Sequence, residues 1–294
     1  MKKSLIALAM VAVAGTALAQ ANDTLAKIKA SGKVVMGVRD SSVGTSYALG
    51  DNKYAGYHVE LCERVLKVIA PAAKIEYSPV TSANRIPLVQ NGTVDIECGT
   101  TTNNTARKEQ VAFAVTTLVT EVRMAVKANS GITSITQLNG KNVATTTGTT
   151  SVQTLRKNEK ANGIDFKEVY GKDHADSFLL LESGRADAFV MDDNILAGNI
   201  ANAKNPADFK IVGEVLSIEP ISIMFRKDDP AFKKAVDDAI KAMMKSGDVE
   251  KLYAKWYMSP IPPKNSNLNL AMGATLKGLL ANPNDNPMEA YVKK

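Results

Sequence analysis

The chain has 294 residues, of which 45% are hydrophobic and 22% are charged, and its formal net charge is +6. This length provides one large domain or two of about 110–150 residues each, and the composition excludes a disordered chain, a collagen and a coiled coil. With only two cysteines and two histidines, a disulfide-dense scaffold is excluded and a structural zinc site is not expected.

The N-terminus has the pattern of a secretory signal peptide over residues 1–19. A basic start (M-K-K) precedes an apolar run over residues 5–14 and an A-L-A end at residues 17–19. A membrane-spanning helix needs ~20 apolar residues, which this run does not reach. We expect cleavage after Ala19 or Ala21 and an exported, soluble mature chain. The residue directly after the cleavage site is not a cysteine, so no lipid anchor is expected.

The mature chain carries a smaller charge than the whole sequence. Removal of Lys2 and Lys3 lowers the net charge from +6 to +4. No dense run of lysine and arginine with interleaved aromatic residues is visible, so a nucleic acid is not expected as a partner.

In chain order, short β-branched runs alternate with helical patterns, which predicts an α/β fold with mostly parallel strands. In the first half we expect strands at 33–38, 74–79, 94–98 and 121–127, and helices at 56–69 and 85–91. In the second half we expect strands at 142–145, 166–170 and 188–191, and helices at 149–162, 176–183, 230–246 and 249–257. Gly92, Gly163 and Gly184 are helix-stop signals. The P-I-P-P-K segment at 260–264 is expected to be extended, because proline removes a donor and fixes φ.

Two aspartates occur in similar settings along the chain. Asp95 lies in N-G-T-V-D-I and Asp187 in S-G-R-A-D-A, each in a helix–Gly–x–x–Asp–strand unit. This repetition indicates two similarly built α/β lobes.

Four loop segments combine arginine or glycine with clustered hydroxyl groups, and each follows a predicted strand. They are R-D-S-S at 39–42, T-S-A-N-R-I-P at 81–87, C-G-T-T-T-N-N-T-A-R at 98–107 and T-T-T-G-T-T-S at 145–151. Ligands of open parallel sheets bind at the carboxyl ends of the strands. Arginine matches a carboxylate bidentately, and a helix N-terminus is an anion site. The pattern therefore favours anion recognition over bond breaking, and no motif for a nucleotide, a metal or a nucleophile is present.

The cysteines and histidines leave alternatives open. Cys62 and Cys98 either pair in an oxidising compartment or are small buried hydrophobic residues. His58 falls within a predicted helix and is interpreted as a surface or half-buried residue of that helix.

At specific stretches the sequence resembles the periplasmic amino-acid-binding proteins of ABC importers, in solute-binding protein family 3. The matching stretches cover nearly the whole mature chain: 39–43, 81–104, 148–151, K-D-H-A-D-S-F at 172–178, 181–189, M-D-D at 191–193, R-K-D-D-P at 226–230 and 260–264. The block at 81–104 and the K-D-H segment match the acidic-amino-acid branch of the family.

The resemblance implies a two-lobed periplasmic-binding-protein fold. Each lobe would be a mostly parallel sheet flanked by helices, and two crossover strands would act as a hinge. The large lobe would comprise residues 20–117 and 220–294, and the small lobe residues 118–219.

The resemblance also implies a ligand set. Arg107 would hold an α-carboxylate, with Thr102 and the helix start at Thr149 and Thr150. Asp192 would take the α-ammonium group, assisted by the backbone of Thr100. The side-chain carboxylate would be surrounded by Arg39, Ser82, Arg85 and His174. Thr100 stands where the family is expected to have serine, and the family's later cysteine is replaced near Ile223, so the resemblance does not carry over a disulfide.

Charge counting supports an acidic ligand independently. Arg39, Arg85 and Arg107 against Asp192 give the predicted site a charge of +2 before His174 is considered. Because a buried carboxylate without a partner is costly, this excess favours a dicarboxylic amino acid over glutamine or histidine.

The function implied by the resemblance is capture of L-glutamate or L-aspartate in the periplasm and delivery to ABC permease subunits in the inner membrane, by a monomer without cofactor or metal. A second hypothesis is a dehydratase-like enzyme on the same fold, with His174 and Glu97 as candidate acid and base. A third is a component that presents the ligand to a membrane receptor. The sequence does not rank glutamate against aspartate.

Overall fold

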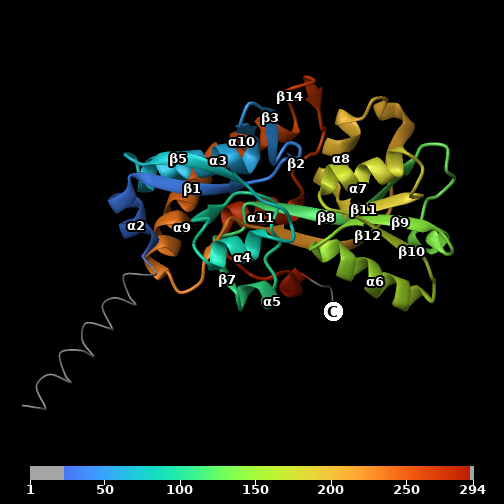
Figure 1. The fold of residues 1–294 in the computed structure, drawn as a ribbon, viewed down its shortest axis with the longest axis horizontal. Coiled ribbons are helices and arrows are strands. Elements are labelled where there is room, and N and C mark those ends of the chain that lie inside the picture. Colours follow the sequence, from blue (N-terminus) through green and yellow to red (C-terminus); the bar gives the residue numbers. More distant parts are fainter. Residues whose placement is uncertain (1–22, 292–294) are drawn as a thin grey trace, which may run out of the picture.

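Two lobes lie side by side and are joined by two long strands (Figure 1). The computed structural model describes residues 23–291, so the expected signal peptide and its cleavage site lie outside the described residues. The joining strands are β8 (Leu118–Lys127) and β12 (Phe209–Ile221), which pair with each other. The expected two-lobed α/β fold is confirmed.

The first lobe is built on a five-stranded sheet of order β5-β1-β6-β13-β7. Its strands are β1 (Lys33–Val38), β5 (Lys74–Pro79), β6 (Ile96–Glu97), β7 (Val111–Phe113) and β13 (Met224–Arg226). Its helices are α2 (Thr24–Ser31), α3 (Tyr57–Ile69), α4 (Arg85–Gln90), α5 (Thr105–Lys108), α9 (Pro230–Lys245), α10 (Asp248–Tyr257) and α11 (Ala274–Ala281). A small antiparallel sheet follows β1 and contains β2 (Ser41–Ser42), β3 (Ser46–Gly50) and β4 (Lys53–Ala55).

The second lobe is built on a sheet of order β10-β9-β11-β8-β12. Its other strands are β9 (Asn142–Thr146), β10 (Lys167–Gly171) and β11 (Ala188–Asp192), and its helices are α6 (Thr150–Asn162), α7 (His174–Glu182) and α8 (Asp193–Asn202). Short elements complete the chain: 3-10 turns at Ile135–Leu138, Pro206–Asp208 and Met288–Tyr291, and the pair β14 (Pro260–Ile261) and β15 (Ser266–Asn267).

Both large sheets are mixed, and in each of them four of the five strands run in one direction, as expected, while one runs in the opposite direction. In the first lobe β1 pairs in parallel with β5 and β6, whereas β13 is antiparallel to β6 and β7. In the second lobe β9 pairs in parallel with β10 and β11, whereas β8 is antiparallel to β11 and β12. The antiparallel strands are the ones that enter a sheet next to a crossing between the lobes. Two parallel neighbouring strands need a crossover connection, usually a helix, that returns the chain to the same edge of the sheet. At a crossing the chain passes between the lobes without such a helix, so the next strand can run antiparallel to its neighbours.

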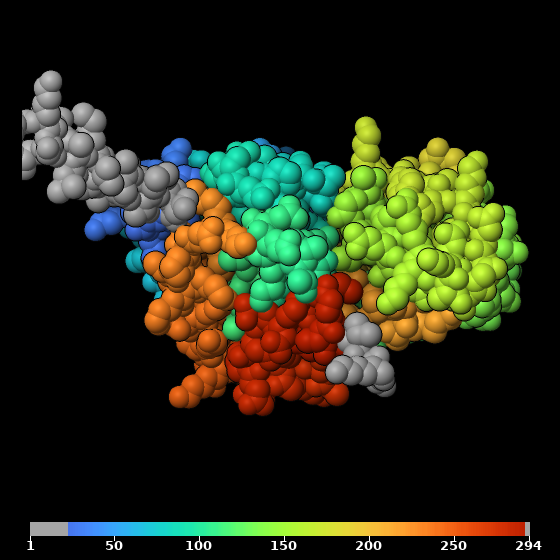
Figure 2. Space-filling view, turned by 90° about the horizontal axis from the view of Figure 1, so that it is seen from below, coloured from blue at the N-terminus to red at the C-terminus, as the bar shows by residue number. Residues whose placement is uncertain are grey.

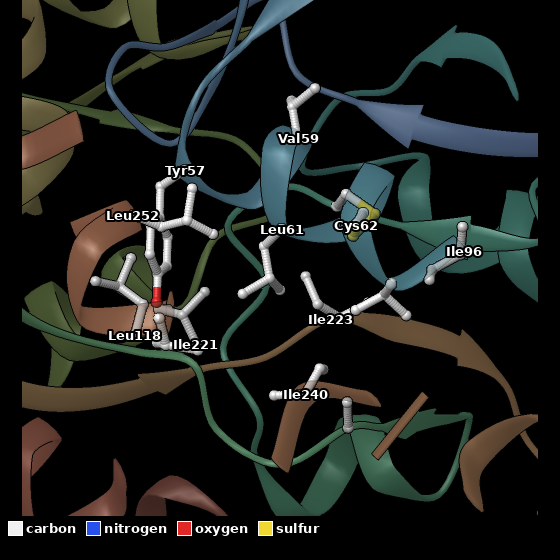
Figure 3. Packing of buried hydrophobic residues seen from close by; sticks show 14 of the residues in the cluster. Tyr57, Val59, Leu61, Cys62, Ile96, Leu118, Ile221, Ile223, Ile240 and Leu252 are labelled. Carbon is white, nitrogen blue, oxygen red and sulfur yellow. A yellow bond between two sulfur atoms is a disulfide. The ribbon is translucent and has the colours of Figure 1, made fainter. Parts of the chain in front are cut away.

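Separate hydrophobic cores support the two lobes. The largest core of the first lobe combines residues of α3, such as Leu61, with Ile221, Ile223 and Ile240 from far later in the chain (Figure 3). The second lobe has one core on each side of its sheet, around Val143 and around Phe189 in the parallel half. The chain therefore builds the first lobe from both of its ends. The lobe boundaries at 117/118 and 219/220 stay a prediction.

The C-terminal segment covers the first lobe beside the crossing strands (Figure 2). The amide of Thr116, just before β8, donates to the carbonyl of Asn284 (2.9 Å), and the amide of Met288 donates to Asn103 (2.8 Å). Within residues 23–291, no helix combines the length and apolarity needed to cross a membrane.

Cys62 and Cys98 form a disulfide, which decides between the two alternatives left by the sequence. Cys62 lies on α3 and Cys98 directly follows β6, and both are buried (Figure 3). The bond therefore ties a core helix to the start of the loop that carries Thr100 and Thr102.

We predict that replacing both cysteines by alanine lowers the free energy of unfolding by about 4 kcal/mol, because the cross-link closes a loop of this length in the unfolded chain. The two cysteines are 36 residues apart. Urea unfolding of the variant and of the wild type is the measurement, and wild type unfolded with a thiol reductant is the control. Equal stability of the oxidised wild type and the variant would contradict the prediction.

Candidate ligand-binding site

The ten predicted site residues meet at the boundary between the lobes, and we call this group the inter-lobe site. Nine of them are buried and Thr149 is partly buried. The first lobe supplies six from the ends of β1, β5 and β6 and from α4 and α5: Arg39, Ser82, Arg85, Thr100, Thr102 and Arg107. The second lobe supplies four from the starts of α6 and α7 and the end of β11: Thr149, Thr150, His174 and Asp192.

Arg39 is held by an acid from the other lobe. Its Nη2 lies 2.5 Å from Oδ1 of Asp173, and its Nη1 donates to Oγ1 of Thr100 (3.2 Å). Ser41 Oγ donates to the other oxygen of Asp173 (2.6 Å). Asp173 directly precedes α7 of the second lobe, whereas Arg39 and Ser41 belong to the first lobe. These hydrogen bonds are therefore polar contacts between the lobes. The sequence analysis placed Asp173 in a matching segment but did not single it out.

His174 is a buried, neutral imidazole. Its Nε2 lies 3.2 Å from Nη2 of Arg39 and its Nδ1 lies 3.0 Å from Oγ1 of Thr146. Burial, followed by the charge of Arg39, lowers the pKa of His174 to about 3. Because guanidinium can only donate, Nε2 accepts from Arg39, and Nδ1 carries the hydrogen and donates to Thr146.

Arg85 and Arg107 are buried and hydrogen-bond to backbone carbonyls. Arg85 Nη1 donates to the carbonyl of Thr100 (3.2 Å). Arg107 donates to the carbonyl of Thr102 (2.9 Å) and, across the lobe boundary, to that of Gly148 (3.4 Å). Within residues 23–291 neither arginine forms an ion pair with a carboxylate, in contrast to Arg39. Burial is the main cause that lowers the pKa of both, that of Arg85 to about 9, so both are cations at neutral pH.

Asp192 is an unpartnered acid at the end of β11. Its Oδ1 is buried and has no hydrogen-bond partner within the described chain. Burial, followed by the nearby charges of Glu219 and Asp193, raises the pKa of Asp192 well above its usual value, and Arg85 and Arg107 oppose this rise. Ser82 Oγ and Arg85 Nε are also buried and without a partner in residues 23–291.

Two buried acids near the site accept hydrogen bonds from the hydroxyl groups of neighbouring residues. Glu219, on the crossing strand β12, is fully buried and accepts from Thr102 (2.5 Å), Thr150 (2.7 Å) and Ser217 (3.1 Å). Glu97 accepts from Thr101 (2.7 Å). Glu219 is not among the predicted site residues, because no motif marks the S-I-E-P segment at 217–220.

The predicted charge excess of +2 leaves out acids that lie close to the arginines or to Asp192. Asp173 pairs with Arg39, and Glu97 and Glu219 are among the charges that act on Arg85, Arg107 or Asp192. Placement matters more than the sum, because Arg39 is paired and the two glutamates are hydrogen-bonded to hydroxyl groups. Arg85, Arg107 and Asp192 are left facing one another without ion-pair partners.

An open groove leads from the inter-lobe site to the surface. It has a volume of about 610 Å³ and is lined by Ile86, Arg107, Thr150, Arg156 and Tyr170 among others. Gly148, which also lines it, has a φ of +81°, and a Cβ there would lie 2.8 Å from the Cα of Ala83 in the other lobe. Glycine is required at this close approach. In the described chain, no cluster of histidine, cysteine, aspartate or glutamate has the arrangement of a metal site.

This arrangement places buried arginines, hydroxyl groups and acids from both lobes at the boundary between them, as in a two-lobed binding protein. Residues 34–259 match the bacterial extracellular solute-binding proteins, family 3. The chain belongs to this family, which confirms the resemblance.

The similarity to curated proteins covers nearly the whole chain. The chain is 45% identical to the L-glutamate/L-aspartate-binding protein of Pseudomonas aeruginosa, over 97% of this chain and 98% of that one. It is 42% identical to the glutamate/aspartate import solute-binding protein of Escherichia coli, over 96% of each. Among solved structures, it is similar to an ancestral amino acid-binding protein, AncCDT-1, a precursor of cyclohexadienyl dehydratase, with a TM-score of 0.70 and 29% identity over 80% of this chain and 99% of that one.

His58 is fully buried, which corrects its interpretation as a surface or half-buried residue. Its Nδ1 lies 2.6 Å from the carbonyl of Gly99 and its Nε2 lies 2.9 Å from Oγ1 of Thr117. A histidine can be buried in a helix when both ring nitrogens are hydrogen-bonded. The partners of His58 are 41 and 59 residues away in the sequence, so the local helical pattern does not reveal them. Burial lowers the pKa of His58 to about 4.

We predict that neither histidine protonates between pH 8 and pH 5 in the folded protein, since burial lowers their pKa values to about 3 and about 4. The chain has only these two histidines, so ¹⁵N NMR of the histidine-labelled protein reports on both. The same sample in urea, titrating near pH 6.5, is the control. A folded-state shift change centred above pH 5.5 would contradict the prediction.

The sign of the stability effect follows from these values. Between the folded pKa values and about 6.5 the unfolded chain binds more protons at both histidines. Their contribution to stability is therefore fully present above pH ~6.5, and it is lost as the pH falls toward the folded values.

Proposed function

We propose that this protein captures L-glutamate or L-aspartate in the periplasm and delivers it to the permease of an ABC importer. The observation that carries the proposal is the set of three buried ionisable groups without ion-pair partners in residues 23–291: two arginines, Arg85 and Arg107, and one acid, Asp192. A dicarboxylic amino acid has the complementary set, two carboxylates and one ammonium group. The names of the relatives with 42% and 45% identity support the same ligands.

The division of the pocket follows from what the ligands share. Arg107 lies beside the start of α6, where the helix N-terminus at Thr149 and Thr150 also favours an anion, so it is assigned to the α-carboxylate. Arg85, with Ser82 nearby, is assigned to the side-chain carboxylate. Glutamine would leave the Arg85 guanidinium buried without a counter-charge, which is costly.

Ligand binding is expected to hold the lobes together. The first lobe contributes Arg85 and Arg107 and the second contributes Asp192 and the start of α6. A small ligand that contacts both sets favours the closed arrangement over an open one, which is the condition for a ligand to shift such an equilibrium. The hinge would lie at the crossings near residues 117–121 and 216–220.

The side-chain contacts favour a binding protein over a dehydratase-like enzyme. Both ring nitrogens of His174 are occupied, and its pKa of about 3 keeps it unprotonated at neutral pH. Glu97 is buried and hydrogen-bonded to Thr101. The other oxygen of Glu97, Oε1, is buried without a hydrogen-bond partner in residues 23–291. His174 therefore has no free ring nitrogen to act as an acid or base, and Glu97 is left as the one of the two with an unpartnered oxygen. Assays for turnover of an amino-acid panel test the enzyme hypothesis, and uptake in a permease deletion separates import from presentation to a receptor.

We predict that L-glutamate or L-aspartate raises the melting temperature, whereas glutamine and lysine have little effect, because only the acidic ligands pair both arginines. At a hundred times its Kd, a ligand adds about 2.7 kcal/mol to stability. Differential scanning fluorimetry with each amino acid at the same concentration is the measurement. An equal shift with glutamine would refute acidic specificity.

We predict that Arg107→Ala abolishes binding of every amino acid, whereas Arg85→Ala mainly removes the preference for acidic ones. Arg107 is assigned to the group that all amino acids share, and Arg85 to one that few have. Losing one member of a buried charge pair costs ~2–5 kcal/mol. Calorimetry with glutamate and glutamine on both variants is the measurement. Near wild-type affinity in Arg107→Ala would show that the division of the pocket is wrong.

A further inference from the structure

Among residues 23–291, Glu219 is the one buried carboxylate that hydrogen-bonds predicted site residues of both lobes. Its Oε2 accepts from Oγ1 of Thr102 in the first lobe (2.5 Å) and from Oγ1 of Thr150 in the second (2.7 Å). Its Oε1 accepts from Ser217 (3.1 Å). Within the described chain it therefore faces three hydroxyl donors.

These contacts fix the direction of two hydroxyl groups. A threonine hydroxyl has one hydrogen and two lone pairs. Since Thr102 and Thr150 both direct their hydrogens to Glu219, their oxygens, 3.3 Å apart, cannot donate to each other or to a ligand. Both oxygens are left as hydrogen-bond acceptors.

An ammonium group is the part of an amino acid that needs acceptors, because it has three donors and no lone pair. Asp192 supplies an unpartnered acceptor oxygen on the same sheet as Glu219. Asp192 is opposite Val122 on β8, and Val122 is opposite Ser217 on β12, so Asp192 and Glu219 are two strands apart. The effect of Glu219 on the pKa of Asp192 shows that the two carboxyl groups interact.

We propose that Glu219 is a positioning residue that directs the hydroxyl hydrogens of Thr102 and Thr150 away from the ligand, so that both oxygens accept from the α-ammonium group beside Asp192. This inference rests on the proposed function. It changes the role that the sequence predicts for Thr102, from a donor to the α-carboxylate to an acceptor from the ammonium group. Arg107 and the helix start at α6 remain with the α-carboxylate. The consequence is discrimination against dicarboxylates that lack an amino group.

The variant Glu219→Gln tests the proposal. Its amide nitrogen donates to one threonine, so the hydrogen of that threonine is free to turn toward the ligand and oppose the ammonium group. We expect the affinity for glutamate to fall by about tenfold or more, while the affinity for glutarate, which lacks the amino group, does not fall. The preference for glutamate over glutamine is expected to stay as in the wild type, because it depends on the side-chain end.

Glu97→Gln is the matched control. It also removes a buried carboxylate that accepts from a threonine, and its partner Thr101 is not among the inter-lobe residues. Glu97 acts on Arg85 and Arg107, so its loss changes the binding of both dicarboxylates alike and leaves the ammonium end untouched. The glutamate-to-glutarate ratio of Glu97→Gln should equal that of the wild type. Glu219→Asp should recover part of the ratio, which a purely structural requirement for the longer side chain would not permit.

Thr150→Val and Thr150→Ser cover the case in which Glu219→Gln does not fold. The valine variant should lose the glutamate-to-glutarate preference and the serine variant should keep it. An unchanged ratio in Glu219→Gln, or in Thr150→Val where Glu219→Gln is unfolded, would overturn the proposal. If the wild type binds another amino acid in place of glutamate and aspartate, the proposed function fails. The same comparison with that amino acid and its desamino analogue then decides the role of Glu219.

Discussion

The structure depends on two buried guanidinium groups that have no carboxylate of the described chain within ion-pair distance. Arg85 and Arg107 are 2% and 8% exposed, so bulk water screens their charges only weakly. Carbonyl oxygens satisfy part of their hydrogen bonding but do not balance the charge. A site of this kind binds an anion strongly because the protein has already met the cost of removing the cations from water. Under the proposed function, the third unpartnered group, Asp192, would restrict the anion to one that also carries a cation.

The fold brings these groups together from distant parts of the chain. Arg85 and Arg107 follow strands of one sheet and Asp192 ends a strand of the other, so the site exists only where the two sheets face each other. The disulfide holds the loop after β6 against α3, and the carbonyls of Thr100 and Thr102 in that loop orient the two arginines. Gly148 allows the second lobe to approach the first at Ala83, where a side chain would collide with the backbone. A rigid loop and a close approach therefore determine the geometry of the charges.

Much of this arrangement could be predicted from the sequence. The periodic segments gave β1, β5, α3 and α6 almost to the residue, because their patterns are local. The crossing strand β12 and the small sheet β2–β4 were missed, since their residues alternate in burial only weakly and contain turn residues such as Asp51 and Asn52 with positive φ. The ten candidate site residues were predicted from strand ends and a family resemblance, and their role in binding stays a prediction. The acids that hold them were not predicted, because Arg39 and Asp173 are 134 residues apart and no local pattern pairs them.

The missed acids explain why counting charges was a poor guide to this site. Asp173, just before α7, pairs with Arg39 of the first lobe. Glu219, on the crossing strand β12, accepts from Thr102 of the first lobe. One contact lies at the start of α7 and the other on the crossing strand. Since these acids are used in contacts between protein groups, they hold the lobes in register without competing for the ligand. Under the proposed function, a ligand would then meet the charges that remain, and its specificity would depend on the side chains that have no partner within residues 23–291.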